Sequence, residues 1–286
     1  MSETVRRRGR TGYLLLLPGA VWLALFFVIP FYSLVATSLY DPNGSVIGGY
    51  EMTWSFSNYW HALQDYWQPL LRSLKYAAIA TFFCLILGYV LAYAIAFKSG
   101  RWKNLMLVLV IAPFFTSFLV RTLSWKLILA DTGPVVAVLR DLHILGPDGR
   151  LLATPVAVIA GLTYNFLPFM VLPLFASLDK IDSRLIEAGN DLYANSFVAF
   201  WKVTWPLSLP GVVSGTLLTF IPAAGDYINA QLLGSPNQRM VGNVIQDLFT
   251  SANDYPAAGA LSMILMIIIV VMVLFYVRRA GTEDLL

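Results

Sequence analysis

Long stretches without any charged residue alternate with polar segments along the chain. Six stand out, at 11–40, 76–97, 104–120, 151–178, 203–225 and 255–277. A helix needs about 20 apolar residues to cross the roughly 30 Å of hydrocarbon in a bilayer, with a lower limit near 17. All six reach this length, and the third continues past Arg121 towards Trp125. The pattern predicts six transmembrane helices, at about 12–38, 74–97, 104–127, 151–178, 207–227 and 255–277.

The composition excludes an ordinary soluble domain. Hydrophobic residues make up 58% of the 286 residues and charged residues only 12%, whereas about 25% of residues in soluble proteins are charged. Six buried core helices would need polar segments to cover them, and this chain has too few. We therefore expect an all-α integral membrane protein, with residues 1–286 forming a single transmembrane domain.

The distribution of basic residues predicts the orientation of the chain. Most of the nineteen Lys and Arg residues lie at the N-terminus, in 98–103, in 179–202 and in the C-terminal tail. Short loops rich in Lys and Arg stay on the cytoplasmic side of a membrane. Both termini are therefore expected in the cytoplasm, as six spans require. The net charge of +3 reflects this bias and does not indicate nucleic-acid binding.

The sequence lacks the patterns of common catalytic and metal-binding sites. Cys84 is the only cysteine, and His61 and His143 lie in different loops, which excludes zinc-ligand spacing. No GxxxxGK[ST] phosphate loop and no GxSxG nucleophile elbow occurs, and few charges within the windows could relay protons. We expect no enzyme activity, no metal site and no cofactor held by this chain. The protein is interpreted as a transport pathway that contains neither a nucleotide site nor a proton relay to drive transport.

Two segments between the apolar windows are also predicted to be helical. The sequence VVAVLRDLHIL, within 130–150, has the spacing of a short helix on the outer surface. Residues 180–206 contain two helical runs, the first starting at Asp182 or Ser183 and the second at Asn195 or Ser196, all favourable N-cap residues. This helix-turn-helix is either an amphipathic element resting on lipid headgroups or a surface that a soluble partner grips.

Residues 187–206 carry a motif that distinguishes these possibilities. The chain resembles the permeases of bacterial ATP-binding-cassette importers, which carry a cytoplasmic loop with the pattern E-A-A, three residues, G, nine residues, I-x-L-P. Glu187, Ala188 and Gly189 occupy the E-A-A positions, and Pro206 the proline. Tyr193 stands where the family has glycine, so the turn between the two helices is expected to be built differently, with Gly189 or Asn195.

The resemblance implies that this segment, placed between the fourth and fifth spans, couples the permease to an ATPase. The implied coupling residues are Glu187, Ala188, Gly189, Asp191, Tyr193, Asn195, Phe197, Phe200 and Trp201. Glu187 would pair with a cation or cap a backbone group on the ATPase, and the aromatic residues would supply buried anchors. A purely structural role for Glu187 within its own helix is the alternative.

The resemblance extends over nearly the whole chain. The stretches 112–125, 164–182 and 206–234 look like the polyamine branch of these permeases, for spermidine and putrescine, and in particular its first permease subunit. This implies a multi-pass permease of the bacterial inner membrane that imports a small organic solute by alternating access. Its implied partners are two ATPase subunits that bind ATP and Mg²⁺, a second homologous permease and an extracytoplasmic solute-binding protein, with no nucleic acid.

Polar and aromatic residues at membrane depth are the candidate solute contacts. They are Asp226 and Tyr227 at the end of the fifth span, Tyr164 and Asn165 in the fourth, and Arg121 and Trp125 at the end of the third. A cationic solute favours a carboxylate and aromatic faces, so Asp226 is the first choice. Arg121 would repel a cation unless it pairs with Asp226 or another acid, and such a pairing is the alternative, structural role of this residue.

Three readings of the function therefore compete. The first is an importer permease, for a polyamine or for another small solute such as an amino acid derivative, an opine or a phosphonate. The second is a self-contained secondary transporter or channel, which would transport alone and would not need a loop that docks an ATPase. The third is a membrane-embedded enzyme, which the absence of a catalytic set disfavours.

Overall fold

The computed structural model describes residues 15–193 and 195–279, apart from a few side chains between 183 and 193 that include Tyr193. Within this range the chain is helical, and its only β-type pairings are isolated bridges between Tyr40 and Met52 and between Ser45 and Gly49. The expectation of an all-α protein is confirmed. The chain forms two compact units, one made of 1–65 with 247–264 and the other of 66–246 with 265–286.

Five helical stretches are long and apolar enough to cross a membrane: Leu15–Ser38, Ser57–Phe97, Pro155–Leu178, Ser196–Ala224 and Tyr255–Arg279. A bent pair, Gly100–Phe115 with Phe118–Ile128, makes a sixth span if its two parts are counted as one. The predicted positions of the spans therefore correspond to helices along the described chain. The predicted start of the first span at residue 12, the basic residues before it and the C-terminal tail lie outside the described residues.

The bent pair takes the place of the span predicted over 104–127. It consists of α4 (Lys103–Ile111), the 3₁₀ turn η3 (Ala112–Phe115) and α5 (Phe118–Ile128), and its two parts meet at 93°. At the break Thr116 is extended, and both its backbone N–H and its hydroxyl donate to the carbonyl of Pro113, at 3.1 and 2.7 Å. A hydroxyl that bonds a nearby carbonyl in this way competes with the helix, which explains the interruption.

The first unit joins the N-terminal span to the loop that follows it. The π-helix η1 (Ala24–Val28) continues into α2 (Ile29–Thr37), and the long helix α3 (Ser57–Phe97) begins in this unit. The Asn58 amide donates to the carbonyls of Ser38 and Tyr40, and the Tyr59 hydroxyl bonds the Ser38 hydroxyl at 2.7 Å. These bonds hold the end of α2 against the start of α3.

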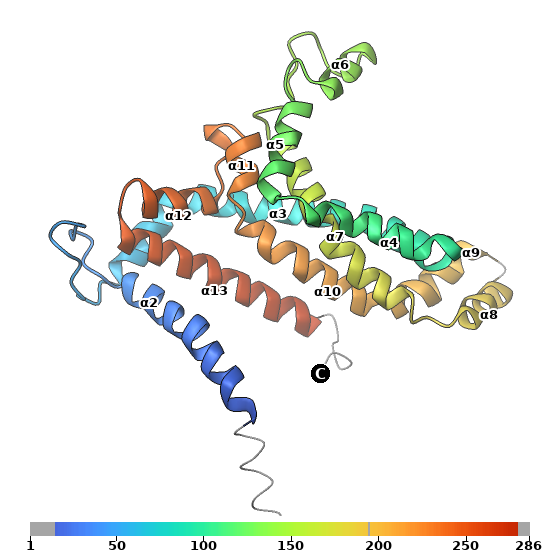
Figure 1. Ribbon diagram of the computed structural model, residues 1–286, viewed down its shortest axis with the longest axis horizontal. Coiled ribbons are helices and arrows are strands. Elements are labelled where there is room, and N and C mark those ends of the chain that lie inside the picture. The colour runs from blue at the N-terminus through green and yellow to red at the C-terminus, as the bar shows by residue number, and fades with distance from the viewer. Residues whose placement is uncertain (1–14, 194, 280–286) are drawn as a thin grey trace, which may run out of the picture. The chain divides into compact units, whose positions relative to one another are not determined.

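The second unit is built around α7 (Pro155–Leu178) and α10 (Trp205–Ala224), which run beside each other (Figure 1). Leu162, Met170, Leu174 and Leu178 of α7 are fully buried. Together with small residues of α3 they form the core that fixes α7, α10 and α3 relative to one another. The short helix α11 (Ile228–Leu233), the turn η5 (Pro236–Gln238) and α12 (Val241–Thr250) then lead to α13 (Tyr255–Arg279).

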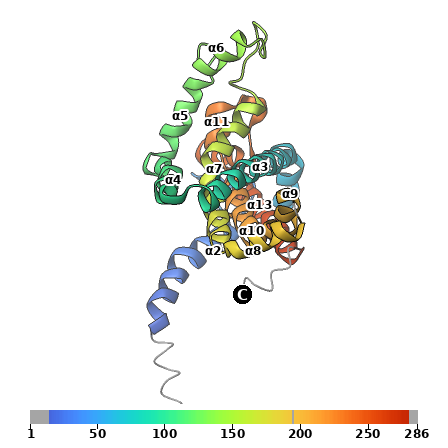
Figure 2. The ribbon, with the colours of Figure 1, turned by 90° about the vertical axis from the view of Figure 1, so that its right-hand side faces the viewer.

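Two further segments of the second unit bear on function. At one end of α7 and α10 lie α8 (Ser183–Tyr193) and α9 (Ser196–Ala199), followed by the π-helix η4 (Phe200–Thr204), as both views show (Figures 1 and 2). Beyond α5 the chain forms α6 (Pro134–Asp141), which confirms the short helix predicted within 130–150. The turn η2 (Gly100–Trp102) precedes α4, and an ion pair between Lys103 and Asp179 ties the start of α4 to the end of α7.

Candidate functional site

The helices α8 and α9 begin at the N-cap residues that the sequence predicted. The Asp182 carboxylate accepts a hydrogen bond from the backbone N–H of Arg184, and the Asn195 side chain accepts one from Phe197, both at 2.9 Å. Each bond satisfies a backbone donor that has no partner within its helix. Asn195 therefore caps the start of α9; the preceding residue, Ala194, lies outside the described residues.

Gly189, at the third position of the E-A-A motif, is buried. A β-carbon at this position would lie 3.0 Å from Cγ2 of Val203 and 3.7 Å from Cβ of Ala199. The close approach of α8 to α9 and η4 thus depends on the absence of a side chain. Tyr193, where the importer permeases carry glycine, ends α8, and its side chain lies outside the described residues.

The outer surface of α8, α9 and the start of η4 is exposed. Glu187, Ala188, Asp191 and Asn195 are exposed, and so are the rings of Phe197 and Trp201, at 69% and 48%. Phe200 differs from these two aromatic residues because it is only partly exposed and its ring packs against α3. The exposed residues make a mixed surface of carboxylates and aromatic rings, which we call the α8–α9 surface.

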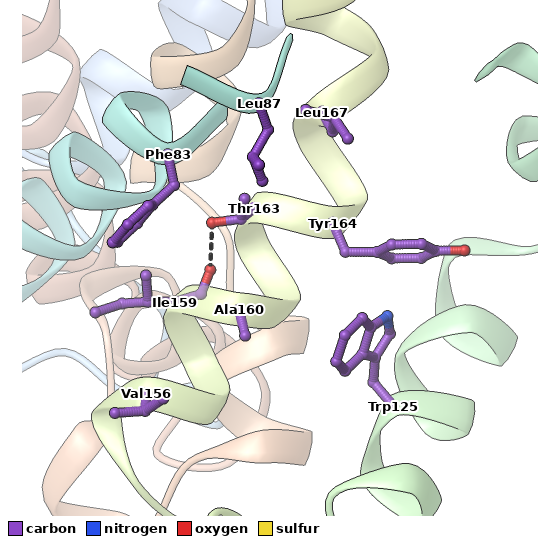
Figure 3. Close-up of a pocket in the computed structure, with 9 residues that line it drawn as sticks. All are labelled: Phe83, Leu87, Trp125, Val156, Ile159, Ala160, Thr163, Tyr164 and Leu167. Atoms are coloured by element: carbon purple, nitrogen blue, oxygen red, sulfur yellow. Dashed lines mark hydrogen bonds between the residues drawn. The ribbon is translucent and has the colours of Figure 1, made fainter. Parts of the chain in front are cut away.

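A second group of predicted residues meets in a cavity between α3, α5 and α7. The cavity has a volume of about 550 Å³, and the rings of Trp125 on α5 and Tyr164 on α7 face each other at its edge with their centroids 5.3 Å apart (Figure 3). Its other walls are almost entirely apolar, formed by Phe83, Leu87, Val156, Ile159, Ala160, Thr163 and Leu167. The Thr163 hydroxyl donates to the carbonyl of Ile159, so it does not present a free donor.

Beside this cavity runs a chain of buried polar side chains. The amide of Asn165 on α7 donates to the hydroxyl of Thr122 at 3.1 Å and to the side-chain oxygen of Asn229 at 3.0 Å. Asn229 in turn donates from its backbone N–H and its amide to Oδ1 of Asp226, at 2.8 and 3.1 Å. Asn165, Asn229 and Thr122 are all at most 1% exposed, and Asp226 is 8% exposed. The network fixes α5, α7 and α11 to one another at the middle of α7.

Close packing supports the same junction. Gly161 of α7 lies one turn before Asn165, and a β-carbon there would come within 2.4 Å of Leu233 and 2.7 Å of the side-chain oxygen of Asn229. Glycine therefore allows α11 to approach α7 closely enough for the Asn165–Asn229 bond to form.

Arg121 does not pair with Asp226. Its guanidinium lies over the rings of Phe114 and Phe118, 5.4 and 5.6 Å from their centroids, on the two sides of the break between η3 and α5. The residue is 8% exposed, and its Nε and Nη1 groups have no hydrogen-bond partner among the described residues. Stacking on aromatic faces partly compensates a buried guanidinium. Arg121 thus contacts both sides of the break and is not part of the Asp226 network.

The structure brings together four of the six predicted pathway residues, as two pairs. Trp125 meets Tyr164 directly, and Asn165 meets Asp226 through Asn229. The sixth residue, Tyr227, is the N-cap of α11 and is 38% exposed. Sequence reasoning missed Asn229 and Thr122. The sequence did carry a signal for Asn229. Asp226 lies three residues before it, and an Asp at the start of a helix commonly accepts a hydrogen bond from the backbone N–H three residues later.

The chain is similar to characterised membrane transport proteins along most of its length. Residues 84–280 match the family described as binding-protein-dependent transport system inner membrane component. The chain is 37% identical over 258 residues to the spermidine/putrescine transport system permease protein PotB of Haemophilus influenzae, covering 90% of each protein. It is also 37% identical over 261 residues to PotB of Escherichia coli K12, covering 91% of this chain and 94% of that protein.

Solved structures share the fold at low sequence identity. The crystal structure of a bacterial ABC transporter involved in the import of the acidic polysaccharide alginate superposes with a TM-score of 0.75 at 17% identity, covering 97% of both chains. A second structure, of a bacterial alginate ABC transporter in complex with an alginate pentasaccharide-bound periplasmic protein, gives 0.76 at 18% identity and covers 96% of both chains.

Proposed function

We propose that this chain is a permease subunit of an ATP-driven importer for polyamines such as spermidine or putrescine. The chain belongs to the family of binding-protein-dependent transport system inner membrane components. The observation that carries this proposal is 37% identity to polyamine permeases over about nine tenths of both chains. As a family member, the chain is a multi-pass component of the bacterial inner membrane. Residues 1–286 act as one permease domain that performs transport and no bond-making chemistry.

The topology follows from the six spans. Counting the bent pair as one span, an even number places both termini on the same side, and the basic loops assign that side to the cytoplasm. The α8–α9 surface, between the fourth and fifth spans, then faces the cytoplasm. A helix-turn-helix in this position is where a soluble ATPase can reach the permease.

The α8–α9 surface docks one of two ATPase subunits, which bind the ATP and Mg²⁺ that the importer uses. Phe197 and Trp201 offer large exposed rings, of the kind that fill pockets at protein interfaces. Glu187, which is also exposed, supplies a carboxylate for a basic side chain or a backbone N–H of the ATPase. Closure of the ATPases on ATP would move this surface and, through it, the spans that it joins.

The solute path passes the junction of α5, α7 and α11. Both hydrogen bonds from Asn229 end on Oδ1 of Asp226, so Oδ2 is the atom that this carboxylate offers to an ammonium group. The rings of Trp125 and Tyr164 contact the methylene segments of the solute and attract its charges, at about 0.5–2 kcal/mol for each cation–π contact. Asn165 fixes the geometry of this junction, whereas Arg121 acts at the break before α5 and Tyr227, exposed at the start of α11, is a further ring available to the solute.

A second, homologous permease and an extracytoplasmic binding protein complete the importer. The bent pair and the cavity beside Trp125 belong to one half of a path that a second six-span subunit would close. The solute-binding protein delivers the polyamine from outside the membrane and supplies most of the selectivity. A permease of the same type for another small organic solute is the second candidate function, because the cavity walls are apolar and accept other alkyl chains.

Uptake in cells tests the proposal. Cells that lack their own polyamine importers would express this chain with its partner permease, ATPase and binding protein, and accumulation of radiolabelled spermidine and putrescine would be measured with and without this chain. We expect accumulation only with the complete set. No accumulation of labelled polyamines, together with accumulation of a labelled amino acid derivative or phosphonate by the same set of proteins, would instead assign the second candidate function.

A further inference from the structure

An aromatic cluster connects the α8–α9 segment to α3. Phe200, the first residue of the π-helix η4, meets Tyr89 of α3 edge-to-face with their ring centroids 5.6 Å apart, and meets Tyr93 one turn further at 6.2 Å. Trp205, the first residue of α10, packs on Tyr89 at 5.3 Å. Trp201 bridges the exposed surface and this cluster, at 5.5 Å from Phe200 and 5.3 Å from Trp205.

A buried hydrogen bond fixes the same contact. The hydroxyls of Tyr89 and Ser208 lie 2.8 Å apart, and Ser208 also donates to the carbonyl of Trp205 at 2.9 Å. Tyr89 is 8% exposed and Ser208 is fully buried. Tyrosines that only mark the edge of a membrane turn their hydroxyls to water or headgroups. Tyr89 instead gives its hydroxyl to α10, so the ring is held at a defined position between the two helices.

The backbone at this contact is unusual. Phe200–Thr204 is a π-helix set between α9 and α10, and single π-turns within helices occur frequently at functional sites. Without a loop between η4 and α10, a displacement of α9 passes directly into the start of α10. The ring of Phe200, which contacts α3, transmits the same displacement to α3, because packed interiors transmit displacements with little compression.

We propose that Phe200 and Tyr89 are positioning residues that carry the movement of the α8–α9 segment to α3, so that α3 and α10 move together when the ATPase acts. This inference rests on the proposed function, since it needs an ATPase to move the segment. It separates the aromatic residues by role: Phe197 and Trp201 face the ATPase, whereas Phe200 faces α3 and acts within the permease. A movement of α3 would also displace Phe83 and Leu87 of the same helix, which line the cavity beside Trp125.

The test compares variants that keep or remove the ring of Phe200. Phe200→Leu keeps an apolar side chain but loses the edge-to-face contacts, Phe200→Tyr keeps them, and Tyr89→Phe removes only the hydroxyl bond to Ser208. Phe82→Leu, on the exposed side of α3, is the matched control. Each complete importer would be reconstituted in liposomes, and solute uptake per ATP hydrolysed would be measured together with the amount of ATPase that copurifies.

In Phe200→Leu we expect the ATPase to remain bound and to hydrolyse ATP, while uptake per ATP falls about threefold or more, as expected for the loss of the two ring contacts between Phe200 and α3. Phe200→Tyr and Phe82→Leu should keep the wild-type ratio, and Tyr89→Phe should lower it. Because Phe200 and Tyr89 act through one contact, the double variant should lose less than the product of the single losses.

A purely structural role would lower the yield of folded complex or its thermal stability and leave uptake per ATP unchanged in the complex that remains. Wild-type uptake per ATP in Phe200→Leu, with a wild-type importer that couples normally, would overturn this inference alone. A wild-type importer without any ATP-driven uptake would overturn the proposed function and this inference with it.

Discussion

Replacing Asn229 by alanine tests the buried polar network most sharply. The change removes two side-chain hydrogen bonds, the one accepted from Asn165 at 3.0 Å and the one donated to Asp226 at 3.1 Å. The backbone bond from position 229 to Asp226 remains available. Asn165 keeps its bond to Thr122, so its amide is only partly deprived of partners. The loss is therefore confined to one bond between α7 and α11 and one bond at the start of α11.

The expected magnitude follows from these two bonds. Hydrogen bonds between helices in membrane proteins contribute on average about 0.6 kcal/mol and at most about 1.7 kcal/mol each. We therefore expect Asn229→Ala to lower the free energy of unfolding by about 1–3 kcal/mol. Asn229→Leu, whose side chain has the same branched shape but a larger volume and so leaves no cavity, should lose at least the same amount if the bonds stabilise the junction.

The assay is unfolding of the purified full-length chain in mixed micelles, titrated with a denaturing detergent and followed by tryptophan fluorescence. The matched control is Asn104→Ala, because Asn104 is an exposed asparagine on α4, and we expect a change of less than about 0.5 kcal/mol for it. An Asn229→Ala protein as stable as the Asn104→Ala protein would refute the claim that the network holds the junction together.

Three further predictions address docking, solute and packing. Glu187→Lys should reduce uptake about tenfold, the loss expected for a charged hydrogen bond, while the variant still inserts into the membrane like the wild type. Wild-type uptake by a variant expressed at the wild-type level would remove Glu187 from the interface. Asp226→Asn should weaken the apparent affinity for a polyamine about tenfold, measured by uptake kinetics, and an unchanged affinity would leave Asp226 with only its structural bonds. Gly161→Ala should destabilise the chain by about 1–3 kcal/mol through the clash with Leu233, judged by the same detergent titration against Gly146→Ala, where a β-carbon meets nothing within 4 Å.

Much of the architecture was predictable because it depends on local chemistry. Uncharged windows located the apolar helices, since a bilayer tolerates few charges over their length. N-cap residues located the starts of α8 and α9, because Asp182 and Asn195 bond backbone groups only two residues away. The helix α6 followed from apolar spacing alone.

The rest depends on contacts between residues far apart in the sequence. The break in the third span was missed because Pro113 lies in a window without charged residues, and only the bonds of Thr116 show where the helix ends. Arg121 was considered as a partner of Asp226, but cation–π contacts with two neighbouring rings hold it instead. The inward orientation of Phe200 could not be read from the sequence, because Phe197, Phe200 and Trp201 all fit one amphipathic pattern and only the position of α3 separates them.

The central claim is that this chain moves a polyamine only when an ATPase acts on it. The most direct measurement is uptake of labelled spermidine into liposomes that contain either this chain alone or the complete importer with its binding protein, with and without ATP and with and without an ion gradient. The account predicts uptake only by the complete importer with ATP, independent of the gradient. Uptake by this chain alone, driven by an ion gradient, would contradict the account and assign a self-contained secondary transporter.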